Sequence, residues 1–233
     1  MKIICIIPAR GGSKGVPRKN VKPLLGIPLI GHSIKAAFQS RCFDRTLVYT
    51  DDQKIVEVAK TFGAEVPFME PAELAQDNSP VVEAIRYALK QLKENENYTS
   101  DYITLIQSTS PLLSSSDIQG AVSLLKKHPE ADSLVTVVEV VNYAPEKIKK
   151  FDGDYLVGYS GEKEGDIKQR HQLPQSYRRN SALYVSKREI WESGKTLGDK
   201  VLGYIMPVNR SVDIDTEYDF HLAEFILKNG YNK

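Results

Sequence analysis

The chain carries almost no surplus charge and few residues that bind metals through sulfur or imidazole. Its 31 lysine and arginine residues and 30 aspartate and glutamate residues leave a formal net charge of +1 at pH 7. Such a balance gives no global attraction to nucleic acid or to an anionic membrane, so neither is expected as a partner. There are only two cysteines and four histidines. Neither Cys5 nor Cys42 has a partner at metal-binding spacing, so we expect no zinc site and no disulfide.

Long apolar runs are also missing. The run KIICIIP at residues 2–8 is too short to span a bilayer, and no signal peptide is visible, so a cytoplasmic protein without membrane association is expected. The remaining composition is that of an ordinary globular protein, with 41% hydrophobic and 26% charged residues. A chain of 233 residues predicts one sizeable domain, spanning residues 1–233.

Strand and helix patterns alternate along most of the sequence. The run at residues 2–7 is nearly continuous in apolar residues, as in a strand that is buried on both faces. Further strands are expected at 46–50, 102–107, 133–140, 182–185 and 201–206, and helices at 30–38, 55–62, 80–92 and 218–226. Another helix is expected after a capping box formed by Ser116 and Gln119.

This alternation predicts an α/β fold, in which a mostly parallel sheet carries helices on both faces. Ligands of such sheets bind beyond the carboxyl ends of the strands. The polar, irregular segment 142–177 interrupts the alternation. We interpret it as an excursion from the domain, either a lid or an oligomerisation arm.

A basic, glycine-rich segment, ARGGSKGVPRKN at residues 9–20, directly follows the first predicted strand. Glycines allow backbone N–H groups to approach a phosphate closely, and Arg and Lys neutralise its charge. The spacing matches neither the P-loop nor the GxGxxG dinucleotide fingerprint. Taken alone, a solvated basic turn is the more common explanation. Its place after a buried strand favours a triphosphate-binding loop, whose cations would be Arg10, Lys14, Arg18 and Lys19.

Two carboxylates lie two residues apart in SVDIDTEYDF, residues 211–220. In an extended segment the side chains of Asp213 and Asp215 point to the same side, where they can hold one Mg²⁺ ion. The structural alternative makes Asp215 a helix N-cap and Asp213 a surface charge. This stretch by itself does not decide between the two interpretations, but the basic loop elsewhere favours the metal.

Arginines gather in RHQLPQSYRRNSALY, residues 170–184, just before a predicted strand. Arg170, Arg178 and Arg179 suit the bidentate binding of a carboxylate. The structural alternative is surface charge, paired with the acidic residues that precede the segment.

Taken together, these motifs resemble the acylneuraminate cytidylyltransferases, also called CMP-sialic acid synthetases. The resemblance runs along essentially the whole chain and is carried by IIPARGGSKGVPRKN, TDD, PAELAQD, QSTSPL, RHQLPQSYRRN and DIDT. It implies a Rossmann-like nucleotidyltransferase domain and a homodimer, in which 142–177 supplies the dimerisation arm. It also implies that CTP and a nine-carbon 2-keto sugar acid react to give a CMP-sugar and pyrophosphate.

The resemblance assigns roles to individual residues. It implies nucleotide binding by Arg10, Gly12, Ser13, Lys14, Lys19 and Asn20. It implies a Mg²⁺ or Mn²⁺ ion at Asp213 and Asp215, and these two residues with Arg10 and Lys14 form the expected catalytic set. It implies sugar binding by Gln107, Arg170, Arg178 and Tyr184.

Three positions depart from the family pattern. Glu70 stands where Arg is common, Leu113 replaces another Arg, and Ser181 stands where Gly is frequent. Because these positions flank the expected sugar pocket, the acceptor is expected to be sialic acid or a relative such as legionaminic or pseudaminic acid. A cytidylyltransferase for 3-deoxy-manno-octulosonic acid and a non-catalytic nucleotide-binding module remain as alternatives.

Overall fold

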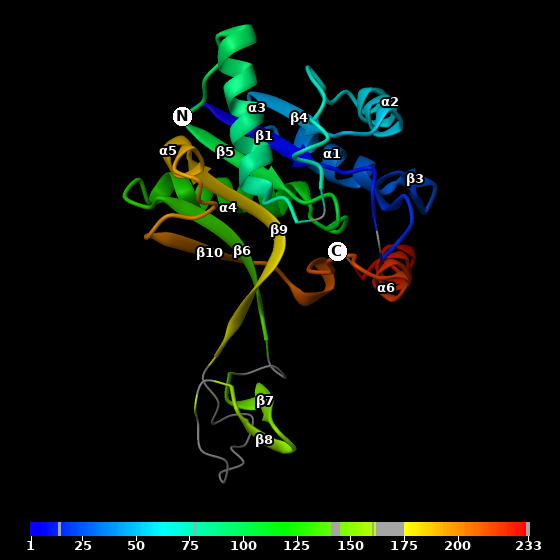
Figure 1. Cartoon of the computed structure of the whole chain (residues 1–233), viewed down its shortest axis with the longest axis vertical. Helices are drawn as coiled ribbons and strands as arrows, with labels where there is room; N and C mark the ends of the chain where they lie inside the picture. The colour runs from blue at the N-terminus through cyan, green and yellow to red at the C-terminus, as the bar shows by residue number, and fades with distance from the viewer. Residues whose placement is uncertain (14, 77, 141–144, 160, 162–174, 232–233) are drawn as a thin grey trace.

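The computed structural model describes residues 1–13, 15–76, 78–140, 145–159, 161 and 175–231. Its centre is a six-stranded sheet in the order β10-β6-β9-β5-β1-β4 (Figure 1). The strands are β1 (Ile3–Pro8), β4 (Arg45–Tyr49), β5 (Tyr102–Ile106), β6 (Ser133–Glu139), β9 (Tyr177–Lys187) and β10 (Val201–Ile205). Strand β1 runs parallel to β4 and β5, and β10 runs parallel to β6. Strand β9 is antiparallel to both of its neighbours, so the predicted mostly parallel sheet is confirmed with one reversed strand.

Helices cover both faces of this sheet, as predicted. They are α1 (Leu29–Ser40), α2 (Gln53–Thr61), α3 (Val81–Glu96), α4 (Ser115–Lys127), α5 (Arg188–Glu192) and α6 (Glu217–Lys228). Side chains alternate along β1, because successive residues of a strand point to opposite faces. Cys5 and its alternate neighbours pack into the cluster under α1, α2 and α4. Ile4 and Ile6 pack into the cluster under α3 and α5, around the buried Trp191.

Shorter elements follow β1. A 3₁₀ turn at Lys19–Val21 leads into the antiparallel pair β2 (Pro23–Leu24) and β3 (Ile27–Pro28), which precedes α1. Gly63 follows α2 with a φ of 86°, so its predicted place just beyond that helix is confirmed. Within the described part of the chain, no helix has the length and apolarity needed to cross a membrane.

The predicted start of α4 is wrong by two residues. Ser114, not Ser116, is the N-cap, and it forms a capping box with Asp117. The Ser114 hydroxyl accepts a hydrogen bond from the Asp117 N–H, and the Asp117 carboxylate accepts one from the Ser114 N–H. Gln119, the predicted partner, instead donates to the Ser40 carbonyl of α1. Gln119 therefore joins α4 to α1, although the local sequence pattern assigned it to a helix cap.

The segment 142–177 contains a hairpin of β7 (Lys149–Asp152) and β8 (Tyr155–Gly158). Figure 1 shows this hairpin projecting away from the main sheet, beyond the ends of β6 and β9. Phe151 and Tyr155 are 76% and 79% exposed on it. Residues 142–144, 160 and 162–174 of the predicted excursion lie outside the described residues.

A buried ion pair connects α4 to the segment that follows β10. The carboxylate of Asp117 is 1% exposed and accepts two hydrogen bonds from Arg210, at 2.9 and 2.8 Å. Arg210 lies three residues before Asp213. The pair therefore fixes the start of the segment that carries the two predicted metal ligands.

Arg210→Ala should lower the free energy of unfolding by about 3 kcal/mol, because it leaves the Asp117 carboxylate buried without its cation. Urea denaturation measures the change. Arg86→Ala is the matched control, since Arg86 pairs with Glu83 at the surface and both side chains are more than 40% exposed. It should cost less than about 0.5 kcal/mol. Equal losses in the two variants would contradict the structural role of Arg210.

Candidate functional site

A cavity of about 600 Å³ lies at the carboxyl ends of β1 and β5. Pro8 and Ala9 line it from the end of β1, and residues 107–109 line it from the end of β5. Parallel strands end at one edge of a sheet, so loops that are distant in sequence meet there. The lining also includes residues of the basic loop, of the segment 70–84 and of the acidic segment 213–215.

Most of the predicted site residues meet in this cavity. They are Arg10, Gly12, Ser13, Lys19, Asn20, Gln107, Asp213 and Asp215. Two further residues, Lys14 and Arg170, lie outside the described residues. Two others, Arg178 and Tyr184, do not line the cavity as the structure describes it.

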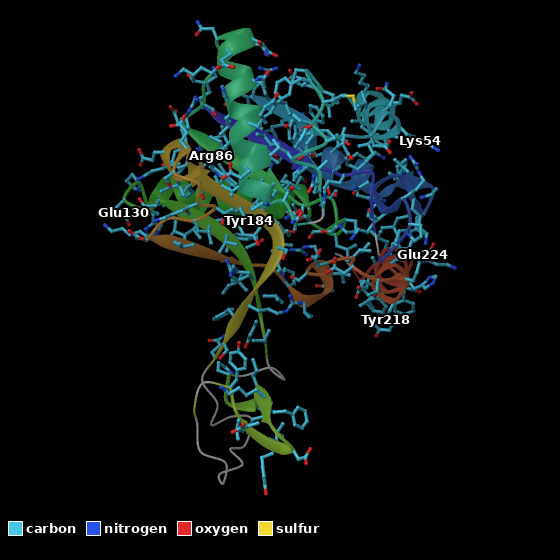
Figure 2. All side chains as sticks on the ribbon, viewed as in Figure 1. Lys54, Arg86, Glu130, Tyr184, Tyr218 and Glu224 are labelled. Atoms are coloured by element: carbon cyan, nitrogen blue, oxygen red, sulfur yellow. The ribbon has the colours of Figure 1, made fainter. Side chains whose placement is uncertain are left out.

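The positions of Arg178 and Tyr184 follow from strand β9. Arg178 is exposed and pairs with Val138 where β9 leads toward the projecting hairpin. Tyr184 is paired with Leu105 and packs against the apolar cluster beneath α3, where Figure 2 labels it. The residue of β9 that does reach the cavity is Ser181, whose φ is 63°.

A third apolar cluster joins the basic loop to the acidic segment. It contains Val16 from the loop, Ile214 from between the two aspartates, and side chains of α6. Figure 1 shows α6 beside the chain that follows β1. Val16 and Ile214 are both fully buried, and each contributes about 1.5–3 kcal/mol by its burial. Because Ile214 points into this cluster, its neighbours Asp213 and Asp215 are turned toward the cavity.

Polar contacts also hold the basic loop against the acidic segment. The Lys19 ammonium donates a hydrogen bond to the Ile214 carbonyl and lies 3.5 Å from a carboxylate oxygen of Asp215. The Asn20 amide donates to the Arg10 carbonyl at 2.9 Å and accepts from the Ser108 hydroxyl at 2.7 Å. Two motifs about two hundred positions apart thus converge on one cavity.

The two aspartates differ in their surroundings. Burial raises the pKa of Asp213, while the nearby Thr109 side chain acts in the opposite direction. One oxygen of Asp213 is buried without a hydrogen-bond partner among the described residues, whereas the Asp215 side chain is 78% exposed. Thr216, rather than Asp215, is the N-cap of α6. The interpretation of Asp215 as a helix cap is therefore wrong.

An unpartnered, buried carboxylate oxygen beside a second carboxylate fits a hard cation such as Mg²⁺. No group of three or more metal-binding side chains occurs within the part of the chain that the structure describes. An ion held by Asp213 and Asp215 would therefore take its other ligands from water and from bound phosphate.

Glu70 belongs to the cavity, although no role follows for it from the sequence. Its side chain lines the cavity beside Leu74 and Ala84, and the residue is only 6% exposed. Burial raises the pKa of Glu70 to about 7, the neighbouring Asp51 acts in the same direction, and Arg10 opposes them. The sequence signal that could have pointed to Glu70 is that it stands where the family commonly has Arg. Leu113, by contrast, lies in the core beneath α4.

Gly15→Ala should destabilise the protein by about 1–3 kcal/mol, because the added methyl group would overlap the Asp215 carbonyl oxygen. Thermal and urea denaturation measure the loss. Gly12→Ala is the matched control in the same loop, since no atom lies within 4 Å of a methyl group at Gly12. If both variants melted alike, the close approach of the loop to the acidic segment would be refuted.

Comparison with known proteins bears on this arrangement. A family model described as cytidylyltransferase matches residues 4–225. The N-acylneuraminate cytidylyltransferase A of Danio rerio is 36% identical over 230 residues, which cover 98% of this chain and 52% of that protein. The pseudaminic acid cytidylyltransferase of Campylobacter jejuni is 32% identical over 230 residues, covering 98% of this chain and 97% of that protein. The chain thus spans about half the length of the first relative and nearly all of the second.

The fold recurs in a solved structure of CMP:2-keto-3-deoxy-manno-octonic acid synthetase complexed with CTP. The TM-score is 0.74 at 14% identity, and the match covers 99% of this chain and 100% of that chain. This match confirms the predicted fold, and the family model and the two relatives confirm the resemblance drawn from the motifs. With its family match running from the first strand into the last helix, the chain belongs to the cytidylyltransferase family.

Proposed function

We propose that this protein transfers CMP from CTP to the anomeric 2-hydroxyl of a nine-carbon 2-keto sugar acid and releases pyrophosphate. One observation carries the proposal: in a chain of this family, a single cavity brings the basic loop and the aspartate pair together. Relatives along nearly the whole chain are named for N-acylneuraminate and pseudaminic acid, which supports an acceptor of that class.

In this reaction the sugar hydroxyl oxygen attacks the α-phosphorus of CTP, its proton passes to water, and the bond to the departing pyrophosphate breaks. Positioning and charge neutralisation do most of the work in such transfers. Arg10, Lys19 and the backbone of Gly12 and Ser13 would bind the triphosphate, with Lys14 predicted to join them. Mg²⁺ or Mn²⁺ at Asp213 and Asp215 would supply neutralisation of the negative charge on the phosphates.

The sugar acid would bind near Gln107, which is the one predicted sugar contact among the described residues that lines the cavity. Arg170, Arg178 and Tyr184 remain sugar-binding predictions. We further propose a homodimer in which the hairpin of β7 and β8 reaches the partner subunit. In a twofold dimer each arm can approach the other cavity, which would give Arg178, at the base of the arm, a route to the partner's substrate. The exposed aromatic side chains of the hairpin support this role.

Asp213→Asn and Asp215→Asn should each lower kcat/KM by about 100-fold or more, because each removes a carboxylate from the metal-binding pair. Pyrophosphate release at saturating Mg²⁺ measures the loss. Chelation of the metal should stop release, and Mg²⁺ or Mn²⁺ should restore it. Asp199→Asn removes an exposed carboxylate outside the cavity and serves as the control. Near-normal turnover of the Asp213 and Asp215 variants would refute the metal site.

A panel of acceptors tests the reaction itself. Sialic, legionaminic and pseudaminic acids are compared with 3-deoxy-manno-octulosonic acid in the same assay. Release of pyrophosphate with a nine-carbon acid supports the proposal, and release with the eight-carbon acid alone replaces it. If the protein binds CTP but releases no pyrophosphate with any of the acids, it is a non-catalytic nucleotide-binding module.

The dimer proposal predicts a solution mass of twice 26.1 kDa by light scattering. The double variant Phe151→Asp, Tyr155→Asp should halve this mass, because it places charge on the apolar surface of the hairpin. Tyr218→Asp is the control, since Tyr218 is 75% exposed on α6, far from the hairpin in Figure 2. If only Tyr218→Asp dissociated the dimer, the interface would lie at α6 and the role of the hairpin in dimerisation would be contradicted.

A further inference from the structure

The segment that carries the aspartate pair begins outside regular secondary structure. Residues 211–214 belong to no helix or strand, and they follow a 3₁₀ turn that ends at Arg210. Arg210 anchors the start of the segment through its buried ion pair, and the Ile214 N–H anchors the end by donating to the Thr109 carbonyl at 2.8 Å. Between these two anchors, the position of Asp213 depends on side-chain contacts with the rest of the domain.

A buried asparagine of β9 supplies such a contact at Ser211. The side-chain amide of Asn180 donates one hydrogen bond to the Ser211 hydroxyl at 2.9 Å and another to the Met206 sulfur at 3.3 Å. The Ser211 hydroxyl in turn donates to the Pro207 carbonyl at 2.9 Å. Asn180 is 0% exposed and Ser211 is 3% exposed, so both groups are shielded from water. A buried polar network whose donors are satisfied is rigid and specifies one arrangement of the chain.

Asn180 reaches the acidic segment because β9 is irregular at that point. Its pairing with β6 shifts in register between Val135 and Val137, and residues 180–183 of β9 lie opposite that shift. The next residue, Ser181, has a φ of 63°, which is uncommon for a residue other than glycine. Bulges redirect side chains and are frequent beside active sites. Here the irregularity turns Asn180 toward the acidic segment and brings Ser181 to the cavity.

The hydrogen bond between Asn180 and Ser211 connects two parts of the cavity wall. Ser181 follows Asn180 in the chain and Asp213 lies two residues after Ser211, and both Ser181 and Asp213 line the cavity. The bond therefore fixes the spacing between them. Neither Asn180 nor Ser211 belongs to the cavity lining as the structure describes it. A site tolerates little displacement of its functional groups, since an error of about 1 Å can cost about 100-fold in rate.

We propose that Asn180 is a positioning residue for the metal-binding pair: through Ser211 it holds Asp213 where the carboxylate can bind the ion. Asn180 acts through the backbone between Ser211 and Asp213 and is not itself a catalytic residue. This role rests on the proposed function, because it assumes that Asp213 binds Mg²⁺ or Mn²⁺ together with CTP. It also gives a function to the irregularity of β9, which interrupts the pairing of that strand with β6.

The contribution of the ion to CTP binding tests this role without turnover. Calorimetry measures the affinity for CTP twice, once with a chelator and once with Mn²⁺, and no sugar acid is present. The ratio of the two affinities is the gain that Mn²⁺ provides. Ser211→Ala and Asn180→Ala should each reduce this gain by about tenfold, the smaller effect expected of a residue that supports a metal ligand. The effect stays small because Arg210 and Ile214 still anchor the segment.

Ser186→Ala is the matched control. Ser186 is also buried in β9, and its hydroxyl also donates to a backbone carbonyl, that of Thr196. Loss of either serine hydroxyl should lower the melting temperature by about 2–4 °C. Only Ser211→Ala should reduce the gain from Mn²⁺, which lowered stability alone would not do.

A double variant separates one shared contact from two separate ones. Asn180→Ala combined with Ser211→Ala should reduce the gain by no more than about twofold beyond Ser211→Ala, because both changes break the same hydrogen bond. If Asn180→Ala does not fold, Ser211→Ala and its control decide the question.

Two results would overturn the inference. One is an unaltered gain from Mn²⁺ in Ser211→Ala. The other is an equal reduction in Ser186→Ala, which would reflect a general loosening of β9. If the wild type releases pyrophosphate and either result is found, the positioning role fails while the proposed function stands. If the wild type gains no CTP affinity from Mn²⁺, the positioning role also fails, and the proposed function fails with it when no sugar acid leads to pyrophosphate release.

Discussion

The site depends on the burial of Val16 and Ile214 in one apolar cluster against α6. These two side chains hold the basic loop against the acidic segment, and Gly15 allows the backbones to touch. The contact brings cations and carboxylates to one cavity, where Lys19 donates to the Ile214 carbonyl and lies close to the Asp215 carboxylate. A triphosphate with a metal ion needs that mixture of charges, because neither sign alone can complement both.

The cavity is lined by both cationic and acidic side chains. Arg10 and Lys19 lie where the phosphates would bind, and Asp213 and Asp215 lie beside them. Glu70 also lines this cavity, and burial disfavours its ionised form. Burial is the main cause that raises the pKa of both Asp213 and Glu70.

The sequence predicts elements that depend on local pattern and misses features that depend on register. The apolar run of β1, the glycine-rich loop and the aspartate pair are all local, and each lies where the pattern placed it. The reversed direction of β9 is not encoded in its alternation, because a strand has the same pattern in both directions. The face that Tyr184 presents follows from its pairing with Leu105, and a shift of one residue would reverse it. The burial of Glu70 likewise depends on the meeting of β4 and the segment before α3, which no short window of sequence contains.

The proposed function requires that the basic loop and the aspartate pair act on one triphosphate. A double-mutant cycle of Lys19→Met and Asp213→Asn, followed by kcat/KM for CTP in pyrophosphate release, tests it most directly. Residues that act on a shared ligand are coupled, so we predict a coupling energy above about 1 kcal/mol. Losses that add to within about 0.5 kcal/mol would show two independent sites and contradict the account.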